Sequence, residues 1–166
     1  RIVTINDIDK EVINYFRVIR EQPEKLVEML KMTPYSRDEY YNAYERIETD
    51  TSIERARKFA VRCWQGFGSS NRYRNGFRSS QRKSPHTTKG WRNVPDRILM
   101  AAERLKNAQI ENLPAVELIK RYNTEDVFIY ADPPYLHGIR KNYLYNYEME
   151  DCEHEELLEI LANHPG

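Results

Sequence analysis

The stretch Asp126-Val-Phe-Ile-Tyr-Ala-Asp-Pro-Pro-Tyr135 decides the fold prediction. Residues 126–131 are a run of β-formers, which predicts a buried parallel strand. The two prolines that follow carry no backbone N–H, so neither a strand ladder nor a helix can continue through them. Ligands of open α/β sheets bind beyond the carboxyl ends of the strands, and Asp132 to Tyr135 should lie at such an end.

The residues after this strand suit the binding of an amino group on a flat ring. A fixed carboxylate beside a proline carbonyl presents two acceptors, and the exocyclic amine of a nucleobase presents two donors. Hydrogen bonds to both acceptors make the nitrogen lone pair less delocalised into the ring, so that the amine can attack an electrophilic methyl group. Tyr135 offers a flat face for an extruded base, a contact worth roughly 1–3 kcal/mol. The alternative is a rigid surface turn with a packed tyrosine.

The rest of the chain alternates between strand and helix patterns. Ile2 to Ile5 form an apolar run that ends at Asn6-Asp7 and predicts a short strand. Capping boxes at Ser36-x-x-Glu39 and Thr51-x-x-Glu54 each predict the start of a helix. We expect a second short strand at 108–111 and helices at 11–20, from Pro23, at 37–48, 52–67, from Pro95, at 114–122 and at 152–163. This order predicts an α/β sheet interrupted by a mainly helical insertion.

The charged residues are unevenly distributed. The chain has 26 basic and 26 acidic residues, but the segment from Arg55 to Pro95 holds 11 basic residues and no acidic one. Aromatic residues are interleaved with these charges, namely Phe67, Tyr73, Phe77 and Trp91. Basic and aromatic residues together suit phosphate contact and base stacking, so the segment predicts a nucleic-acid partner. A solvated basic loop is the alternative.

Within the basic segment, residues 66–93 follow neither a helical nor a strand period. A loop of this length is normally functional or disordered, and it can contain a hairpin. Asn75-Gly76, between Tyr73 and Phe77, is a hairpin-turn signal.

Several classes of protein are excluded by composition. Gly and Pro together number only 14 of 166 residues, which excludes collagen-like and Gly/Pro-rich disordered chains. No apolar run approaches the 18 residues or so of a membrane-spanning helix, and the first residues are too acidic for a signal peptide. Cys63 and Cys152 lie far apart in the chain, and neither stands at the spacing of a metal ligand from the other or from a histidine. We therefore expect reduced thiols, no metal site and a cytosolic protein.

Beyond Asp132-Pro-Pro-Tyr135, further stretches carry a resemblance to a known family: Ile5-Asn-Asp-Ile-Asp9 with the helix Glu11–Arg20, Thr33-Pro-Tyr-Ser-Arg37, Arg97–Leu105, Ile110-Glu-Asn112 and His154–Leu158. The chain resembles the D12 class of DNA adenine-N6 methyltransferases, typified by bacterial and phage adenine methylases. The resemblance covers almost the whole chain, and Asp-Pro-Pro-Tyr is its most specific part.

Position by position, this resemblance implies roles for individual residues. Asp132 and the backbone carbonyl of Pro133 would hold the target amine, Pro134 would stiffen the loop, and Tyr135 would stack on the flipped adenine. Asp7 resembles the acidic residue that holds the ribose hydroxyls of S-adenosylmethionine. Asp is also a good helix N-cap, so capping is the other interpretation of Asp7, and both can hold.

The resemblance also implies an architecture. We expect a Rossmann-like, S-adenosylmethionine-dependent methyltransferase α/β sheet, incomplete in this chain, with a mainly helical, basic insertion. Residues 1–32 and 96–166 would form the core, and residues 33–95 the DNA target-recognition insertion. The expected DNA-binding residues are Arg72, Arg74, Arg78, Arg82, Lys83 and Lys89. Arginine is suited to guanine edges in the major groove.

The implied reaction is methyl transfer from S-adenosylmethionine to the N6 amine of a flipped adenine in duplex DNA. Enzymes of this kind take part in restriction–modification, among other roles. We expect a monomer in the cytoplasm of a prokaryotic or phage-infected cell. We expect it to bind neither a metal nor a membrane. Two alternatives stay open. One is methylation of adenine in ribosomal RNA, and the other is a catalytically inactive, truncated DNA-binding relative.

One departure from the family concerns the cofactor. The family carries a Gly-rich cofactor loop after its first strand, before the position of Ile2, whereas the first glycine here is Gly66. Gly66-Phe-Gly68 ends a predicted helix, so it is a poor match to a dinucleotide-binding loop. We therefore expect a partial chain that binds S-adenosylmethionine weakly by itself.

Overall fold

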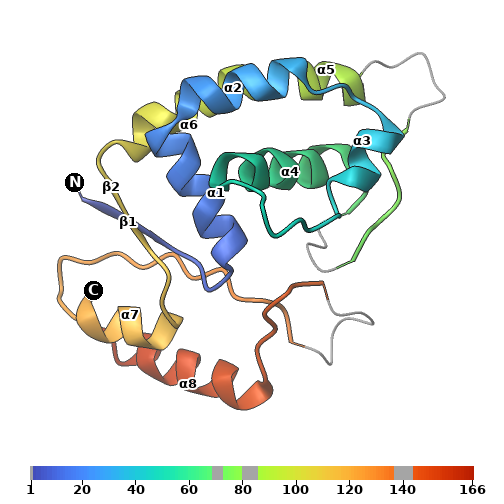
Figure 1. The fold of residues 1–166 in the computed structure, drawn as a ribbon. Helices are drawn as coiled ribbons and strands as arrows, with labels where there is room; N and C mark the ends of the chain where they lie inside the picture. The colour runs from blue at the N-terminus through green and yellow to red at the C-terminus, as the bar shows by residue number, and fades with distance from the viewer. Residues whose placement is uncertain (1, 69–72, 80–85, 137–143) are drawn as a thin grey trace.

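The computed structural model of this chain describes residues 2–68, 73–79, 86–136 and 144–166. Helices α1 to α6 gather on one side of two short strands, and α7 and α8 pair on the other side (Figure 1). The helices within the described residues are α1 (Lys10–Glu21), α2 (Pro23–Met32), α3 (Arg37–Asn42), α4 (Ser52–Gln65), α5 (His86–Arg92), α6 (Val94–Leu105), α7 (Ala115–Arg121) and α8 (Asp151–Ala162).

The two strands form a small parallel sheet. Strand β1 (Val3–Asn6) pairs with β2 (Ala108–Glu111), with Ile5 opposite Ile110. The two short strands predicted at Ile2 to Ile5 and at 108–111 are therefore confirmed, the first of them shifted by one residue. Parallel neighbours need a long crossover connection, which helices α1 to α6 provide here. Because the strands are parallel, their carboxyl ends lie at the same edge of the sheet.

The prediction of a buried strand at residues 126–131 is wrong. Val127 and Ile129 are half-buried, but Phe128 and Tyr130 are 87% and 82% exposed. The segment pairs with neither β1 nor β2, and no other described strand lies beside it. A strand exists only where a neighbour takes its backbone N–H and C=O groups, so β-forming residues alone do not make one.

Helices α3 and α4 begin where the sequence predicts, but their capping boxes are only half formed. Ser36 Oγ accepts from the backbone N–H of Glu39 at 3.1 Å, and Thr51 Oγ1 accepts from that of Glu54 at 3.3 Å. Both glutamate carboxylates bind Arg57 instead of folding back onto their caps. The hydrogen bonds from Glu54 and Glu39 raise the pKa of Arg57. Arg57 therefore joins the start of α3 to α4.

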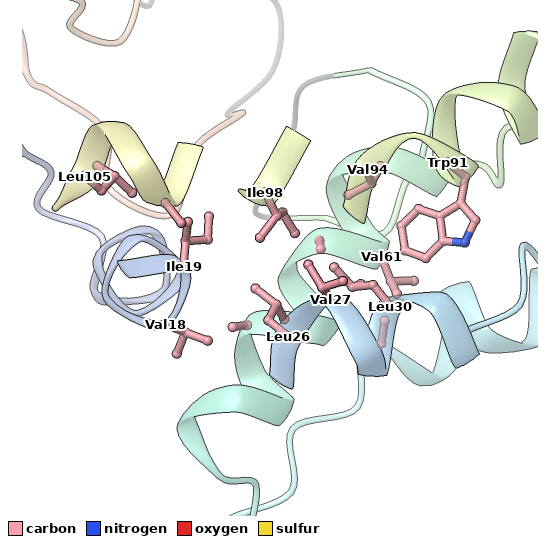
Figure 2. Packing of buried hydrophobic residues seen from close by; sticks show 14 of the residues in the cluster. Val18, Ile19, Leu26, Val27, Leu30, Val61, Trp91, Val94, Ile98 and Leu105 are labelled. Atoms are coloured by element: carbon pink, nitrogen blue, oxygen red, sulfur yellow. The ribbon is translucent and has the colours of Figure 1, made fainter. Parts of the chain in front are cut away.

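The hydrophobic core lies between α1, α2, α4 and α6 (Figure 2). Leu26 of α2 is fully buried, and it shares this core with Ile19, Val61 and Ile98 from the other three helices. Burial of each such side chain contributes roughly 1.5–3 kcal/mol. Trp91 of α5 lies at one end of the same cluster. The core thus holds together helices that come from both the predicted core segment and the predicted insertion.

Helix α5 is absent from the sequence prediction because residues 86–92 include a glycine and two threonines, which have low helix propensity. Tertiary packing outweighs this propensity. Trp91 is 7% exposed, and its indole N–H donates to the carbonyl of Thr33 at 3.0 Å. The proposed stacking role of Trp91 on nucleic acid is therefore wrong, because its ring is part of the core.

The basic loop contains a hairpin, but Asn75-Gly76 is not its turn. The N–H of Phe67 donates to the carbonyl of Gly76 at 2.8 Å, and the N–H of Arg78 donates to that of Gln65 at 2.7 Å. These bonds place residues 76–78 alongside 65–67. A two-residue Asn-Gly turn needs positive φ at both positions, and neither Asn75 nor Gly76 has it.

An ion pair fixes the connection between α3 and α4. Lys58 Nζ lies 2.7 Å from Asp50 Oδ2 and donates to the carbonyl of Glu45 at 2.9 Å. Both side chains are largely shielded from water. The hydrogen bond from Lys58 lowers the pKa of Asp50 below its ordinary value.

We expect this pair to make the protein sensitive to acid. Because the folded-state pKa of Asp50 is lowered, its stabilising effect is complete above the unfolded pKa of 3.8 and is lost as the pH falls through the folded value. Lys58→Met should therefore lower the free energy of unfolding at neutral pH and flatten its decline below about pH 4. Urea unfolding at neutral and acidic pH measures both effects, with the exposed Lys106→Met as control. Equal acid sensitivity of Lys58→Met and the wild type would contradict the expectation.

Candidate functional site

The carboxyl ends of β1 and β2 are joined by asparagine side chains. Asn6 donates from Nδ2 to the carbonyl of Leu113 and accepts at Oδ1 from its N–H, both at 3.0 Å. In the other direction, Asn112 Nδ2 donates to the carbonyls of Asp7 and Ile8 at 2.7 and 3.0 Å. These bonds fix the two loops that leave the sheet, and this edge is where α/β proteins bind ligands.

Asp7 lies in the first of these loops. Its Oδ1 accepts from the backbone N–H of Asp9 at 2.7 Å, and burial raises its pKa. Its second oxygen, Oδ2, accepts from none of the described residues. The N-cap of α1 is Asp9, which accepts from the N–H of Glu11 at 2.8 Å. The capping interpretation of Asp7 is therefore wrong, and ligand binding by Asp7 stays a prediction.

A distant part of the chain returns to the same edge of the sheet. Asn146 Nδ2 donates to Asp9 Oδ2 at 2.9 Å, so the segment before α8 contacts the start of α1. Glu148 holds this segment by accepting from the N–H groups of Leu144 and Tyr145 at 2.8 and 3.0 Å. Sequence analysis did not find Asn146, since a single asparagine in an irregular segment carries no recognisable pattern.

The segment Asp132 to Tyr135 presents its two polar ends to solvent. Asp132 is exposed, and it forms no ion pair with a described residue. Pro133 and Pro134 are half-buried, and the side chain of Tyr135 is 67% exposed. A carboxylate and a phenol ring thus flank a stiff proline pair, and both are accessible to an incoming molecule.

Four of the 11 basic residues counted in the sequence are used inside the fold. Arg55 binds Glu11 at 2.8 Å, Arg57 and Lys58 form the ion pairs described above, and Arg62 donates to the carbonyl of Ala43 at 2.7 Å. Burial lowers the pKa of Arg62. The positive charge on α4 therefore serves packing, and the charge left for a partner is smaller than the sequence suggests.

The expected DNA-binding residues fall into two groups. Arg72, Arg82 and Lys83 lie outside the described residues. Arg74 and Lys89 are exposed and Arg78 is half-buried, and none of these three pairs with a described carboxylate.

The hairpin that carries Arg74 and Arg78 is anchored through its backbone. The hydroxyl of Tyr35 donates to the carbonyl of Arg78 at 2.6 Å, and the hydroxyl of Tyr40 donates to that of Asn75 at 2.7 Å. Both tyrosines belong to the segment at and before α3. The hairpin is thereby attached to the helical bundle through its main-chain carbonyls.

Neither a metal centre nor a membrane span is found in the part of the chain that the structure describes. There, no three His, Cys, Asp or Glu side chains are grouped so as to hold a metal ion. No helix among the same residues combines the length and the apolar character needed to cross a membrane.

Comparison with known protein families finds a match over almost the whole chain. The family model described as D12 class N6 adenine-specific DNA methyltransferase matches residues 2–165. The matched range includes both strands, Asp7 and the segment from Asp132 to Tyr135. No curated protein matches the chain.

Proposed function

The chain belongs to the D12 class N6 adenine-specific DNA methyltransferase family, and from this we propose that it transfers a methyl group from S-adenosylmethionine to the N6 amine of adenine in duplex DNA. The observation that carries the proposal is the accessible Asp132 carboxylate, which directly precedes a rigid proline pair and the exposed Tyr135.

In this proposal Asp132 and Pro133 act on the target amine. The carboxylate of Asp132 and the carbonyl of Pro133 accept the two amine hydrogens, which leaves the nitrogen lone pair less delocalised into the ring and available to attack the methyl group. Tyr135 stacks on the adenine after it leaves the duplex and offsets part of the cost of unstacking. After transfer the nitrogen releases one proton, which Asp132 passes to the surrounding water.

The residues at the sheet edge fit the proposed cofactor. S-adenosylmethionine supplies the electrophilic methyl group when it is bound. Ribose hydroxyls are hydrogen-bond donors, and Asp7 Oδ2 is an acceptor at the carboxyl end of a parallel strand with no described donor of its own. We assign ribose binding to Asp7 on this ground, and the bonds from Asn112 hold its backbone in place.

Asp7→Asn should weaken cofactor binding while the local fold is kept. The amide oxygen can still accept from the N–H of Asp9, but the negative charge that strengthens a hydrogen bond to a ribose hydroxyl is lost. We expect the Kd for S-adenosylmethionine to rise about tenfold or more, measured by calorimetry on the protein expressed from the full gene. Asp96→Asn, at an exposed acid of α6, is the control. An unchanged Kd would remove the role of Asp7.

We further propose that β1 and β2 belong to a Rossmann-like methyltransferase sheet, with residues 1–32 and 96–166 in the core and 33–95 as the recognition insertion. The parallel pairing of β1 with β2, and the polar residues at their carboxyl ends, support this assignment. The hairpin and α3, which carry exposed arginines, lie within the proposed insertion.

The proposed reaction is tested by finding which cellular nucleic acid carries N6-methyladenine, and at which sequence. DNA from cells that express the full gene should contain N6-methyladenine at one sequence context, and DNA from cells without the gene should lack it there. Methylation-sensitive sequencing measures this directly. If N6-methyladenine appears in ribosomal RNA and not in DNA, the substrate is ribosomal RNA and the proposed DNA substrate is wrong. Duplex DNA binding without methylation of either nucleic acid would favour an inactive relative.

A further inference from the structure

Two arginines from different parts of the chain meet at one aromatic ring. The guanidinium carbon of Arg74, in the hairpin, lies 4.6 Å from the ring centroid of Tyr41. Arg37, in α3, donates from Nη1 to the hydroxyl of the same Tyr41 at 3.3 Å. Arg37 also lies over Phe77, with 5.1 Å between its guanidinium carbon and the ring centroid. Aromatic side chains therefore orient both cations.

These two charges have no counter-charge among the described residues. Both arginines are exposed, and neither lies within 4.0 Å of a described carboxylate. Asp38, next to Arg37 in the chain, instead accepts from Asn42 at 3.4 Å. The arginines of α4 differ, since Arg57 binds two glutamates. Two neighbouring like charges repel each other, so an anion bound between them would be stabilised.

The position of Arg37 is not explained by the stability of its helix. It is the first residue of α3, directly after the N-cap Ser36. Cations are unfavourable at this end of a helix, because the backbone dipoles make it positive. The described contacts of Arg37 run to Tyr41 and Phe77, which hold the guanidinium group without neutralising it.

We propose that Arg37 and Arg74 together bind a phosphate of the DNA backbone. This inference rests on the proposed function, because it takes duplex DNA as the partner. A guanidinium group presents parallel N–H donors that match two phosphate oxygens, and an aromatic face fixes its plane. Arg37 lies outside the basic segment 55–95, so the charge pattern of the sequence does not single it out.

The location of the pair suggests what it contributes. Figure 1 shows α3 at the end of the helical bundle away from β1 and β2. A phosphate bound there is held apart from the sheet edge where Asp7 lies. Phosphate contacts fix the register and orientation of a protein on the duplex and carry no base information themselves. Arg37 and Arg74 thus position the DNA rather than read its sequence.

The test is the salt dependence of binding to duplex DNA, measured by fluorescence anisotropy on the whole chain. Arg37→Ala should lower the slope of log affinity against log salt concentration by about one. The affinity should fall roughly fivefold at physiological salt, which is the share of one phosphate contact. Arg37→Lys should keep most of the slope because it keeps the charge. The matched control is Arg104→Ala, at an exposed arginine of α6.

The outcomes separate this inference from the proposed function. If the wild type binds duplex DNA in a salt-dependent way but Arg37→Ala keeps its slope and affinity, the inference is wrong and the proposed function stands. A preserved slope with a relaxed sequence preference would also overturn it, because Arg37 would then read a base. If the wild type binds structured RNA and not duplex DNA, the proposed function and this inference both fail. Because Arg37 is exposed, an unchanged thermal midpoint is expected and serves as the check on folding.

Discussion

Asp132→Ala should reduce methyl transfer to DNA by about 10²–10³-fold or more and leave the affinity for duplex DNA nearly unchanged. In the proposed reaction, the substitution removes the carboxylate that accepts one hydrogen of the target amine, and this interaction matters most while the nitrogen develops positive charge. The proposed DNA contacts are arginines elsewhere in the chain, so the affinity for DNA should stay nearly the same. Transfer is measured with labelled S-adenosylmethionine and the protein expressed from the full gene.

Two further variants make this measurement specific. Asp132→Asn keeps the shape and one oxygen acceptor but loses the charge, so an intermediate activity is expected. Asp126→Ala removes another exposed acid, six residues before Asp132, and the activity of this variant should match the wild type. Unchanged turnover in Asp132→Ala would remove Asp132 from the reaction. Equal losses in Asp132→Ala and Asp126→Ala would show that the segment as a whole is needed and not the carboxylate.

Trp91→Ala should have the largest effect on stability, lowering the free energy of unfolding by about 3–5 kcal/mol. The ring is 7% exposed and packs in the cluster that contains Val61 and Val94. The substitution leaves a cavity and also leaves the carbonyl of Thr33 without its donor. Urea unfolding followed by circular dichroism measures the change.

Smaller substitutions separate the cavity from the lost hydrogen bond. Trp91→Phe fills most of the space but lacks the N–H, so it should cost about 1–3 kcal/mol. Phe67→Ala removes an aromatic residue of the same basic segment that is 52% exposed, and its effect on stability should be small. Equal stability of Trp91→Ala and Phe67→Ala would contradict the position of Trp91 in the core.

Local signals in the sequence were sufficient for the starts of α3 and α4 and for the two paired strands. Ser36 and Thr51 cap α3 and α4 as their capping boxes predict, because the Ser or Thr oxygen and the N–H three residues later interact within one turn. A local sequence pattern does not predict that Glu39 and Glu54 bind Arg57, since Arg57 reaches Glu39 only after α3 and α4 pack together.

The wrong predictions concern residues whose structure depends on distant parts of the chain. Residues 126–131 have the right composition for a strand, but pairing needs a neighbour that composition cannot supply. Trp91 is of a residue type that suits nucleic-acid contact, but it is buried because α5 folds against α4 and α6. Of the candidate site, Asp7 and Asp132 follow strand-like runs in the sequence, and their roles stay predictions. Asn146 could not be identified from the sequence, because only the folded chain brings it to Asp9.

The way the hairpin is attached bears on which of its side chains can be exchanged. The tyrosine hydroxyls at positions 35 and 40 bind carbonyl groups, and every amino acid carries a carbonyl. Exchanging the side chains at positions 75 and 78 therefore leaves these anchors intact. Substitutions at these two positions can therefore change the hairpin's side chains without a compensating change in the bundle that supports it.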